Sequence, residues 1–133
     1  MEDSELLCVP TYVAQSRIHG LGLYAAQPLQ RGALIWRFDA RADRILTTAE
    51  LDAEALRTGR ALRIHAYEQE PGSWVLCGDD AIYMNHDDNP SCDDPDPQRT
   101  VARRSIATGE ELTVDYRLFD RAAASWLPAT RTA

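Results

Sequence analysis

Three short segments of the chain carry side chains that could act together in chemistry. The last of them, GEELTVDY (109–116), ends in the pair Asp115–Tyr116. The middle segment, MNHDDNP, contains Asn85–His86, and the first, HGLGLYA, contains Gly20 and Gly22. A tyrosine hydroxyl can hold or polarise a reacting group without being a strong nucleophile, and glycines allow the backbone to approach a ligand closely. These residue types favour a site that holds and orients its reactants.

Each segment also permits a purely structural interpretation. A G-x-G without a third glycine and a following helix is not a dinucleotide site and is equally typical of a tight turn. A lone histidine such as His86 and a strand tyrosine such as Tyr116 are commonly structural. The run Asp87-Asp88-Asn89 has oxygen ligands for a cation but lacks the spacing, glycine and closing glutamate of a calcium loop. We therefore expect no metal.

Taken together, in this order and at these separations, the three segments resemble the SET domain, the fold of most protein lysine methyltransferases. The resemblance covers roughly residues 11–119. The family form of the middle segment is Asn-His-Ser-Cys-x-Pro-Asn, and this chain keeps Asn85, His86 and Pro90 but carries Asp87, Asp88 and Ser91 at changed positions. No cysteine-rich zinc module flanks these segments, so the resemblance is to minimal viral and bacterial members.

The resemblance implies S-adenosylmethionine (SAM) as methyl donor and a lysine in a basic protein or peptide as acceptor. It implies cofactor contacts from the first and middle segments, with Phe119 or Trp126 covering the adenine. The residues expected to bind the cofactor are His19, Gly20, Leu21, Gly22, Leu23, Tyr24, Asn85, His86 and Phe119.

Tyr116 is the expected catalytic residue. A lysine amine has a reference pKa of about 10.4 and must lose a proton before it can accept a methyl group; a narrow apolar channel favours its neutral form, and a hydroxyl can then aim its lone pair. The resemblance places Phe38, Tyr83 and Val114 along this channel. Val114 stands where many relatives carry Phe or Tyr. Core packing is the more typical role for the other aromatic residues considered, which are Trp36, Tyr67 and Trp74.

Two functions of different class remain open. The first is a SAM-dependent protein-lysine N-methyltransferase, favoured by Gly20, Gly22, Asn85, His86 and Tyr116. The second is a catalytically weak SET-fold module that binds SAM or a basic peptide, favoured by the changed positions near Pro90 and the missing zinc module. A plain β-rich interaction domain with chance motif matches is a third.

The elements that must position these residues are mostly short strands, identified from runs of β-formers between turn residues. They are expected at 11–16, 22–27, 33–38, 63–69, 73–78, 99–106 and 111–116, with a polar loop at 87–97. Thr47 or Thr48 predicts the start of a helix over 48–60, and the tail has a short helix near 119–126. The expected class is β-rich α+β: a SET-domain fold of several small β-sheets, with a short helical insert and a knot-like C-terminal segment. Residues 1–10 form an extension, 11–119 the domain and 120–133 a tail.

Composition limits the partners. The chain has 133 residues and a net charge of −7, which argues against direct nucleic-acid binding and favours basic partners. The acidic residues between Asp87 and Asp96 are expected to attract a cationic substrate. No apolar run is long enough for a bilayer and no leader is evident, so we expect a cytoplasmic protein without membrane contact; a homodimer is possible. All fourteen basic residues are arginines. Cys8, Cys77 and Cys92 form no CxxC pair and predict free thiols.

Overall fold

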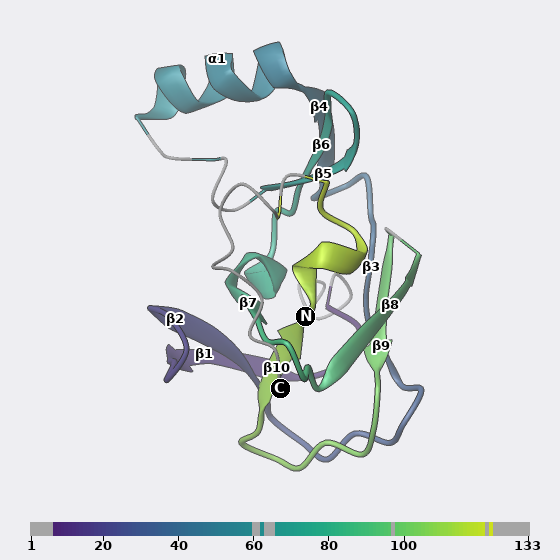
Figure 1. Cartoon of the computed structure of the whole chain (residues 1–133). Helices are drawn as coiled ribbons and strands as arrows, with labels where there is room; N and C mark the ends of the chain where they lie inside the picture. The colour runs from purple at the N-terminus through teal and green to yellow at the C-terminus, as the bar shows by residue number, and fades with distance from the viewer. Residues whose placement is uncertain (1–6, 60–61, 63–65, 97, 122, 124–133) are drawn as a thin grey trace.

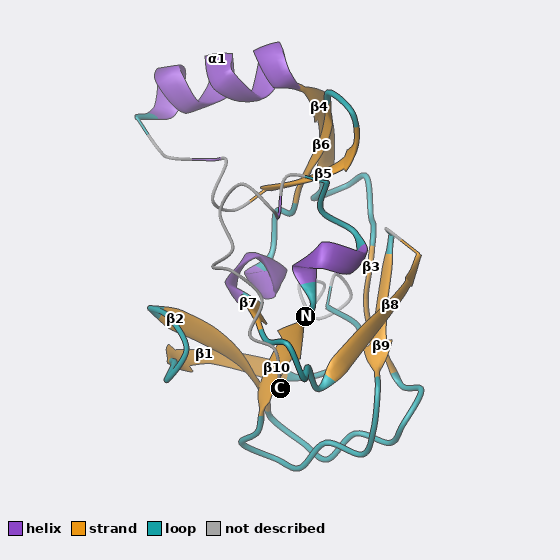
Figure 2. Cartoon of the chain, in the orientation of Figure 1, coloured by secondary structure: helices purple, strands orange, loops and turns teal. Residues whose placement is uncertain are grey.

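The computed structural model describes residues 7–59, 62, 66–96, 98–121 and 123 (Figure 1). Within them, short strands form three small sheets, and an α-helix projects at one end of the molecule (Figure 2). The strands are β1 (Thr11–Gln15), β2 (Leu21–Ala25), β3 (Leu34–Arg37), β4 (Arg44–Thr47), β5 (Ala66–Glu70), β6 (Ser73–Leu76), β7 (Asn85–His86), β8 (Cys92–Asp96), β9 (Arg99–Ala102) and β10 (Glu111–Val114). The helices are α1 (Thr48–Thr58) and the 3₁₀ turns η3 (Asp80–Tyr83) and η4 (Tyr116–Leu118). The predicted β-rich α+β class is confirmed.

The C-terminal strand lies in the middle of the main sheet, whose order is β1-β2-β10-β7. β10 runs antiparallel to β2, with Leu112 opposite Leu23, and parallel to β7, with Thr113 opposite Asn85. A late segment is therefore inserted between two strands made earlier, as expected of a knot-like C-terminal segment. This insertion brings the first, middle and last segments of the sequence analysis onto adjacent strands.

The second sheet, β3-β9-β8, corrects a prediction. Residues 87–97 were expected to be a loop, but β8 pairs antiparallel with β9, with Cys92 opposite Ala102 and Asp93 opposite Val101. Proline cannot donate to a ladder, yet an edge strand tolerates it. Pro95 lies where the register shifts, on the edge strand of this sheet. Acidic residues and prolines therefore led to the prediction of a loop where the structure has a strand.

The third sheet, β4-β6-β5, carries α1 at the end of the molecule shown uppermost in Figure 1. α1 begins at a capping box: Glu50 N donates to Thr47 Oγ1 (3.1 Å) and Thr47 N donates to Glu50 Oε1 (2.8 Å). It ends at Gly59, whose φ of 70° is left-handed. The predicted helix start is thus correct, whereas β4 was not predicted.

The main core lies between the first two sheets, and it includes Leu7 from before β1. Beyond η4, Asp120 Oδ1 accepts a hydrogen bond from Glu68 N (2.9 Å) and ties the chain to β5. Half of the predicted helix near 119–126, including Trp126, lies outside the described residues. None of the helices described is long and apolar enough to cross a membrane. The largest fully buried side chains are Leu23, Ile35, Leu51, Leu112, Val75, Cys92 and Ser91.

Candidate active site

Tyr116 begins η4 directly after β10 and is fixed at two points. Its hydroxyl donates to the backbone oxygen of Met84 (2.6 Å), and its backbone N–H donates to His86 Nδ1 (3.2 Å). Burial raises the pKa of Tyr116 above its ordinary value. The hydroxyl is therefore protonated at neutral pH.

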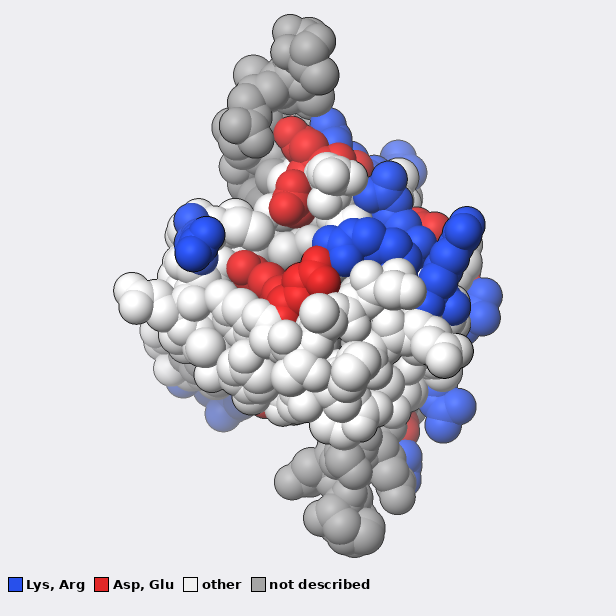
Figure 3. All heavy atoms as spheres, turned by 90° about the horizontal axis from the view of Figure 1, so that it is seen from below, with Lys and Arg blue, Asp and Glu red and all other residues white. Residues whose placement is uncertain are grey.

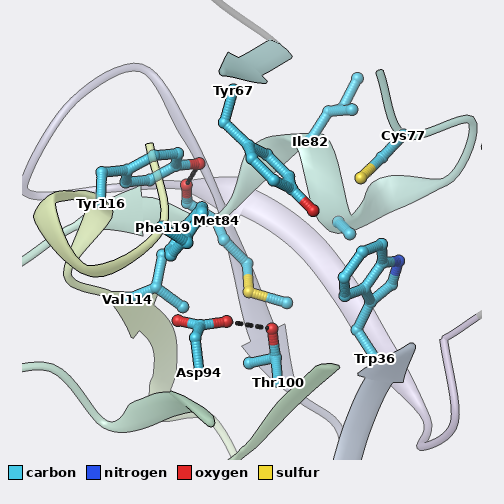
Figure 4. Close-up of a pocket in the computed structure, with 11 residues that line it drawn as sticks. Trp36, Tyr67, Cys77, Ile82, Met84, Asp94, Thr100, Val114, Tyr116 and Phe119 are labelled. Carbon is cyan, nitrogen blue, oxygen red and sulfur yellow. Dashed lines mark hydrogen bonds between the residues drawn. The ribbon is translucent and has the colours of Figure 1, made fainter. Parts of the chain in front are cut away.

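Tyr116 is part of the wall of a narrow cavity of about 30 Å³ (Figure 4). The ring of Phe119 connects two other rings there, at a centroid distance of 5.0 Å from Tyr116 and 4.8 Å from Tyr67. Val114 and Met84 complete the apolar part of the wall near Tyr116. The space has room for a water-sized group, so only the tip of a long side chain fits without movement. The lining residues are Trp36, Tyr67, Cys77, Ala81, Ile82, Met84, Asp94, Thr100, Val114, Tyr116 and Phe119.

Asp94 is the acidic residue in this wall. Thr100 Oγ1 donates to its Oδ1 (2.6 Å), whereas its Oδ2 is buried and has no hydrogen-bond partner among the described residues. Burial is the main cause that raises the pKa of Asp94 to about 7, with a smaller contribution from the charges of nearby aspartates. The cavity therefore combines aromatic walls with one under-satisfied carboxyl group.

Asn85 holds the first and middle segments together. Its side-chain Nδ2 lies 3.1 Å from the backbone oxygens of His19 and Leu21 and 3.1 Å from Glu111 Oε2. Ser16 Oγ also donates to the Glu111 carboxylate (2.9 Å). We call the side chains of Ser16, Asn85 and Glu111 the polar junction. The junction fixes the loop before β2 against β10.

The polar junction also explains Gly22. A Cβ at this position would overlap Glu111 Oε2 and lie 3.0 Å from Ser16 Cβ. Gly20 differs, because its φ is +49° and a Cβ there would meet nothing within 4 Å. One glycine therefore accommodates a neighbouring carboxylate, and the other supplies a left-handed turn beside open space.

His86 is held between acidic groups. Its Nε2 lies 2.7 Å from Asp88 Oδ1, and its Nδ1 accepts from Tyr116 N. Arg117 Nη2 lies 3.1 Å from Asp88, and Arg117 Nε donates to Asp115 (2.9 Å). Burial favours a higher pKa for Asp115, but hydrogen bonds and charge from Arg117 outweigh it and hold the pKa below its usual range. This network orients the backbone on both sides of Tyr116.

The predicted cofactor residues between His19 and Tyr24 differ in how exposed they are. Leu23 is fully buried in the core, with its backbone in the ladders to β1 and β10. Tyr24 stacks on Tyr12 at 5.4 Å and donates its hydroxyl to the Gln15 oxygen. His19, Gly20 and Leu21 are exposed at the loop. The loop before β2 is thus the accessible part of this segment.

Of the predicted channel residues, one lines the cavity and two do not. Val114 lines the cavity, whereas Phe38 and Tyr83 pack half-buried against the main core and are not in the cavity wall. Tyr67 and Asp94 also lie in the wall: core packing was the more typical role considered for Tyr67, and Asp94 was expected only as one of the acids that attract a cationic substrate. The alternation of Cys92 and Asp94 would have shown Asp94 on the inner face, had 92–96 been identified as a strand.

Comparison with known proteins decides the family. The family model of the SET domain matches residues 20–117. The chain belongs to the SET domain family. This SET domain is 30% identical over 114 residues to Histone-lysine N-methyltransferase trr of Drosophila melanogaster, and 31% identical to Histone-lysine N-methyltransferase 2D of Homo sapiens. Each match covers 80% of this chain but only 5% and 2% of the relatives' lengths.

Solved structures agree on the fold of this SET domain. A candidate histone methyltransferase of Plasmodium falciparum superposes with a TM-score of 0.58 at 16% identity, over 81% of this chain and 93% of that one. A mutant Ezh2 in apo ctPRC2 gives a TM-score of 0.66 at 20% identity, over 88% of this chain and 16% of that one. At these identities the likeness establishes the fold.

Proposed function

We propose that this SET domain transfers methyl groups from SAM to a lysine side chain of a basic protein or peptide. The observation that carries the proposal is the narrow cavity in which the Tyr116 hydroxyl meets aromatic and apolar walls. The proposal is also supported by relatives whose names are histone-lysine N-methyltransferases.

The residues at the polar junction fit a cofactor with polar ends. Open space lies over Gly20, and Asn85 uses its Nδ2 within the junction while its Oδ1 accepts no hydrogen bond from the described residues. We propose that the His19–Leu21 loop, Asn85 and His86 hold SAM, with Phe119 beside it. When bound, SAM supplies a methyl group on a positively charged sulfur.

The residues of this chain then act on the acceptor amine. A lysine is almost wholly protonated at neutral pH, and burial between Tyr67, Val114 and Phe119 disfavours that charge. The Tyr116 hydroxyl donates to Met84 O, so its oxygen can accept a hydrogen bond from the amine. Catalysis in this proposal is mainly orientation and desolvation.

The test is transfer of labelled methyl from SAM to a mixture of basic proteins, including histones. The absence of lysine in this chain is useful here, since label on the chain itself cannot be lysine self-modification. Calorimetry of SAM binding and mass spectrometry of the acceptor complete the experiment. Transfer that requires Tyr116 supports the proposal; a parent chain that binds no SAM would sink it.

A binding module is the second candidate, because three positions depart from the family's middle segment. All three departures have defined partners: Ser91 Oγ donates to Glu111 O (2.9 Å), Asp87 Oδ1 accepts from Asn89 N (2.9 Å), and Asp88 contacts His86 and Arg117. The changed residues thus support the site's framework, which favours the enzyme. Binding of SAM or a basic peptide without any transfer would favour the module instead.

A further inference from the structure

We propose that Asp94 is the residue that receives the cationic amine of the substrate and takes a proton from it. This inference rests on the proposed function and adds to it a base on the opposite side of the cavity from Tyr67 (Figure 4). It is argued from the position of the Asp94 carboxyl group, its unused oxygen and its surroundings.

Asp94 reaches the cavity because successive side chains of β8 point to opposite faces of the sheet. Cys92 is buried, Asp93 is exposed and Asp94 turns inward toward Thr100 and Val114. Thr100 fixes Oδ1, so the orientation of the carboxyl group is set from one side. Oδ2 is left buried without a partner among the described residues. The carboxyl group is therefore held in place with one acceptor atom unused.

Structural aspartates elsewhere in the molecule are satisfied differently. Both oxygens of Asp43 accept backbone N–H groups, from Asp39 (2.8 Å) and Gly78 (3.0 Å). Asp79 also has a buried unpartnered oxygen, but it caps η3 through Ala81 N and is not in the cavity wall. A buried polar atom without a partner costs about 1–3 kcal/mol. Asp94 carries this cost at the cavity without the backbone contacts that Asp43 makes.

The charges around Asp94 favour an incoming cation. Asp93, Asp96 and Asp115 add negative potential at Asp94, and no arginine among the described residues pairs with it. Arg99, the nearest basic residue in sequence, pairs instead with Asp96 (2.8 Å). On the face shown in Figure 3, acidic and arginine side chains lie beside one another. The cavity thus differs from the outer surface, because its acid has no counter-ion among the described residues.

A substrate ammonium group would supply the missing partner. One N–H bond of the ammonium breaks, its proton forms an O–H bond with Asp94 Oδ2, and the electron pair stays on nitrogen. The amine becomes neutral and the carboxylate becomes a neutral acid, so charge is conserved. The nearby Tyr67, Tyr116 and Cys92 have pKa values raised by burial and stay protonated, whereas a carboxyl with a pKa of about 7 is a suitable acceptor near neutral pH.

The first test needs no turnover. Methylammonium, which represents the tip of a lysine side chain, is titrated into the protein with ¹³C-labelled aspartate, and the Asp94 carboxyl signal is followed by NMR against pH. Methanol is the uncharged probe of the same size, and Asp94→Asn assigns the signal. We expect methylammonium, but not methanol, to lower the pKa of Asp94. Equal responses to the two probes, or undiminished methylammonium binding by Asp94→Asn, would overturn the inference.

The second test compares Asp94→Asn with Asp93→Asn, a matched change on the exposed face of the same strand. Asparagine keeps an acceptor for Thr100, and thermal melting checks folding. We expect a loss of about tenfold or more in methyl transfer for Asp94→Asn with unchanged SAM affinity, and only a slight loss for Asp93→Asn. Full activity in Asp94→Asn contradicts the inference while leaving the proposed function intact. If the parent transfers nothing, the methylammonium titration still decides on Asp94.

Discussion

The acidic side chain of the polar junction and that of the cavity differ in whether their oxygens accept hydrogen bonds. Glu111 receives hydrogen bonds from Ser16 and Asn85 and fills the space left by Gly22. Asp94 receives one hydrogen bond from Thr100 and has a second oxygen buried without a partner. The satisfied acid holds segments together, whereas the under-satisfied acid is available to a ligand. For these two acids, satisfaction of hydrogen bonds more than charge separates framework from site.

The strongest test of this contrast is the stability of Asp94→Asn. The pKa of Asp94 is about 7 in the folded chain against an ordinary value of 3.8. Between these values the folded state binds more protons than the unfolded state, so stability falls as pH rises from about 4 through about 7. Asparagine does not titrate. We expect the variant to be more stable by about 2–4 kcal/mol at pH 8, and the difference to vanish near pH 4.

Urea denaturation of both proteins at the two pH values measures this difference. Asp79, whose pKa burial raises to about 6, titrates in both proteins and cancels. An equal stability difference at pH 4 and pH 8 would show that ionisation of Asp94 is not the cause.

Removal of Glu111 should destabilise the protein, whereas Asp94→Asn should stabilise it. Glu111→Ala leaves Ser16 and Asn85 without their shared acceptor, and we expect a loss of about 1–3 kcal/mol in the free energy of unfolding. Glu111→Gln keeps one acceptor oxygen and should lose less. Weaker SAM binding should accompany the loss in Glu111→Ala, because the His19–Leu21 loop is no longer held. Unchanged stability would mean that water replaces the polar junction at no cost.

Tyr116→Phe tests the cavity without altering its shape. The phenyl ring keeps the contact with Phe119, while the hydrogen bond to Met84 O and the acceptor for the amine are lost. We expect a drop of about tenfold or more in turnover, equivalent to at least 1.4 kcal/mol, with SAM affinity retained. Single-turnover kinetics and calorimetry separate the two quantities. Equal turnover in both forms would remove Tyr116 from the reaction.

The smallest effect is expected at Asp93, which is exposed beside Asp94. Asp93→Asn should change the free energy of unfolding by no more than about 0.5 kcal/mol. If the exposed acids steer a basic protein, capture of the substrate should weaken slightly in this variant and with rising salt. Capture that does not vary with salt would leave these acids as solvated surface.

Local signals in the sequence predicted much of the framework. Thr47 or Thr48 marked the start of α1, and the run of β-formers at 22–27 between turn residues marked β2. The family resemblance brought Asn85 and Tyr116 into one site, and the sheet order places β7, which carries Asn85, beside β10, which Tyr116 follows. These predictions depend on neighbouring residues or on a shared motif, which a sequence displays directly.

The missed features depend on long-range packing. Asp94 appeared as one of several loop acids, because Pro95 and its acidic neighbours are typical of loops and the partner strand β9 is not visible in the local pattern. Gly22 was expected to allow ligand approach, which stays a prediction; its neighbour Glu111, 89 positions later by their numbers, is visible only in the structure. Phe38 follows Trp36 by two positions, so a strand pattern expects both side chains on the same face. Only the position of the cavity shows that Trp36 lines it.

The central position of β10 has a consequence for synthesis of the chain. β2 and β7 are made well before residues 111–114, yet β10 lies between them. On a ribosome adding about 5–20 residues each second, the nascent chain therefore holds two unpaired strand edges until residues 111–114 emerge. Such edges readily pair with other chains. The same late event that brings Tyr116 beside Asn85 also closes these edges, so a chain that stops before residue 111 would lack the assembled site and would be prone to aggregate.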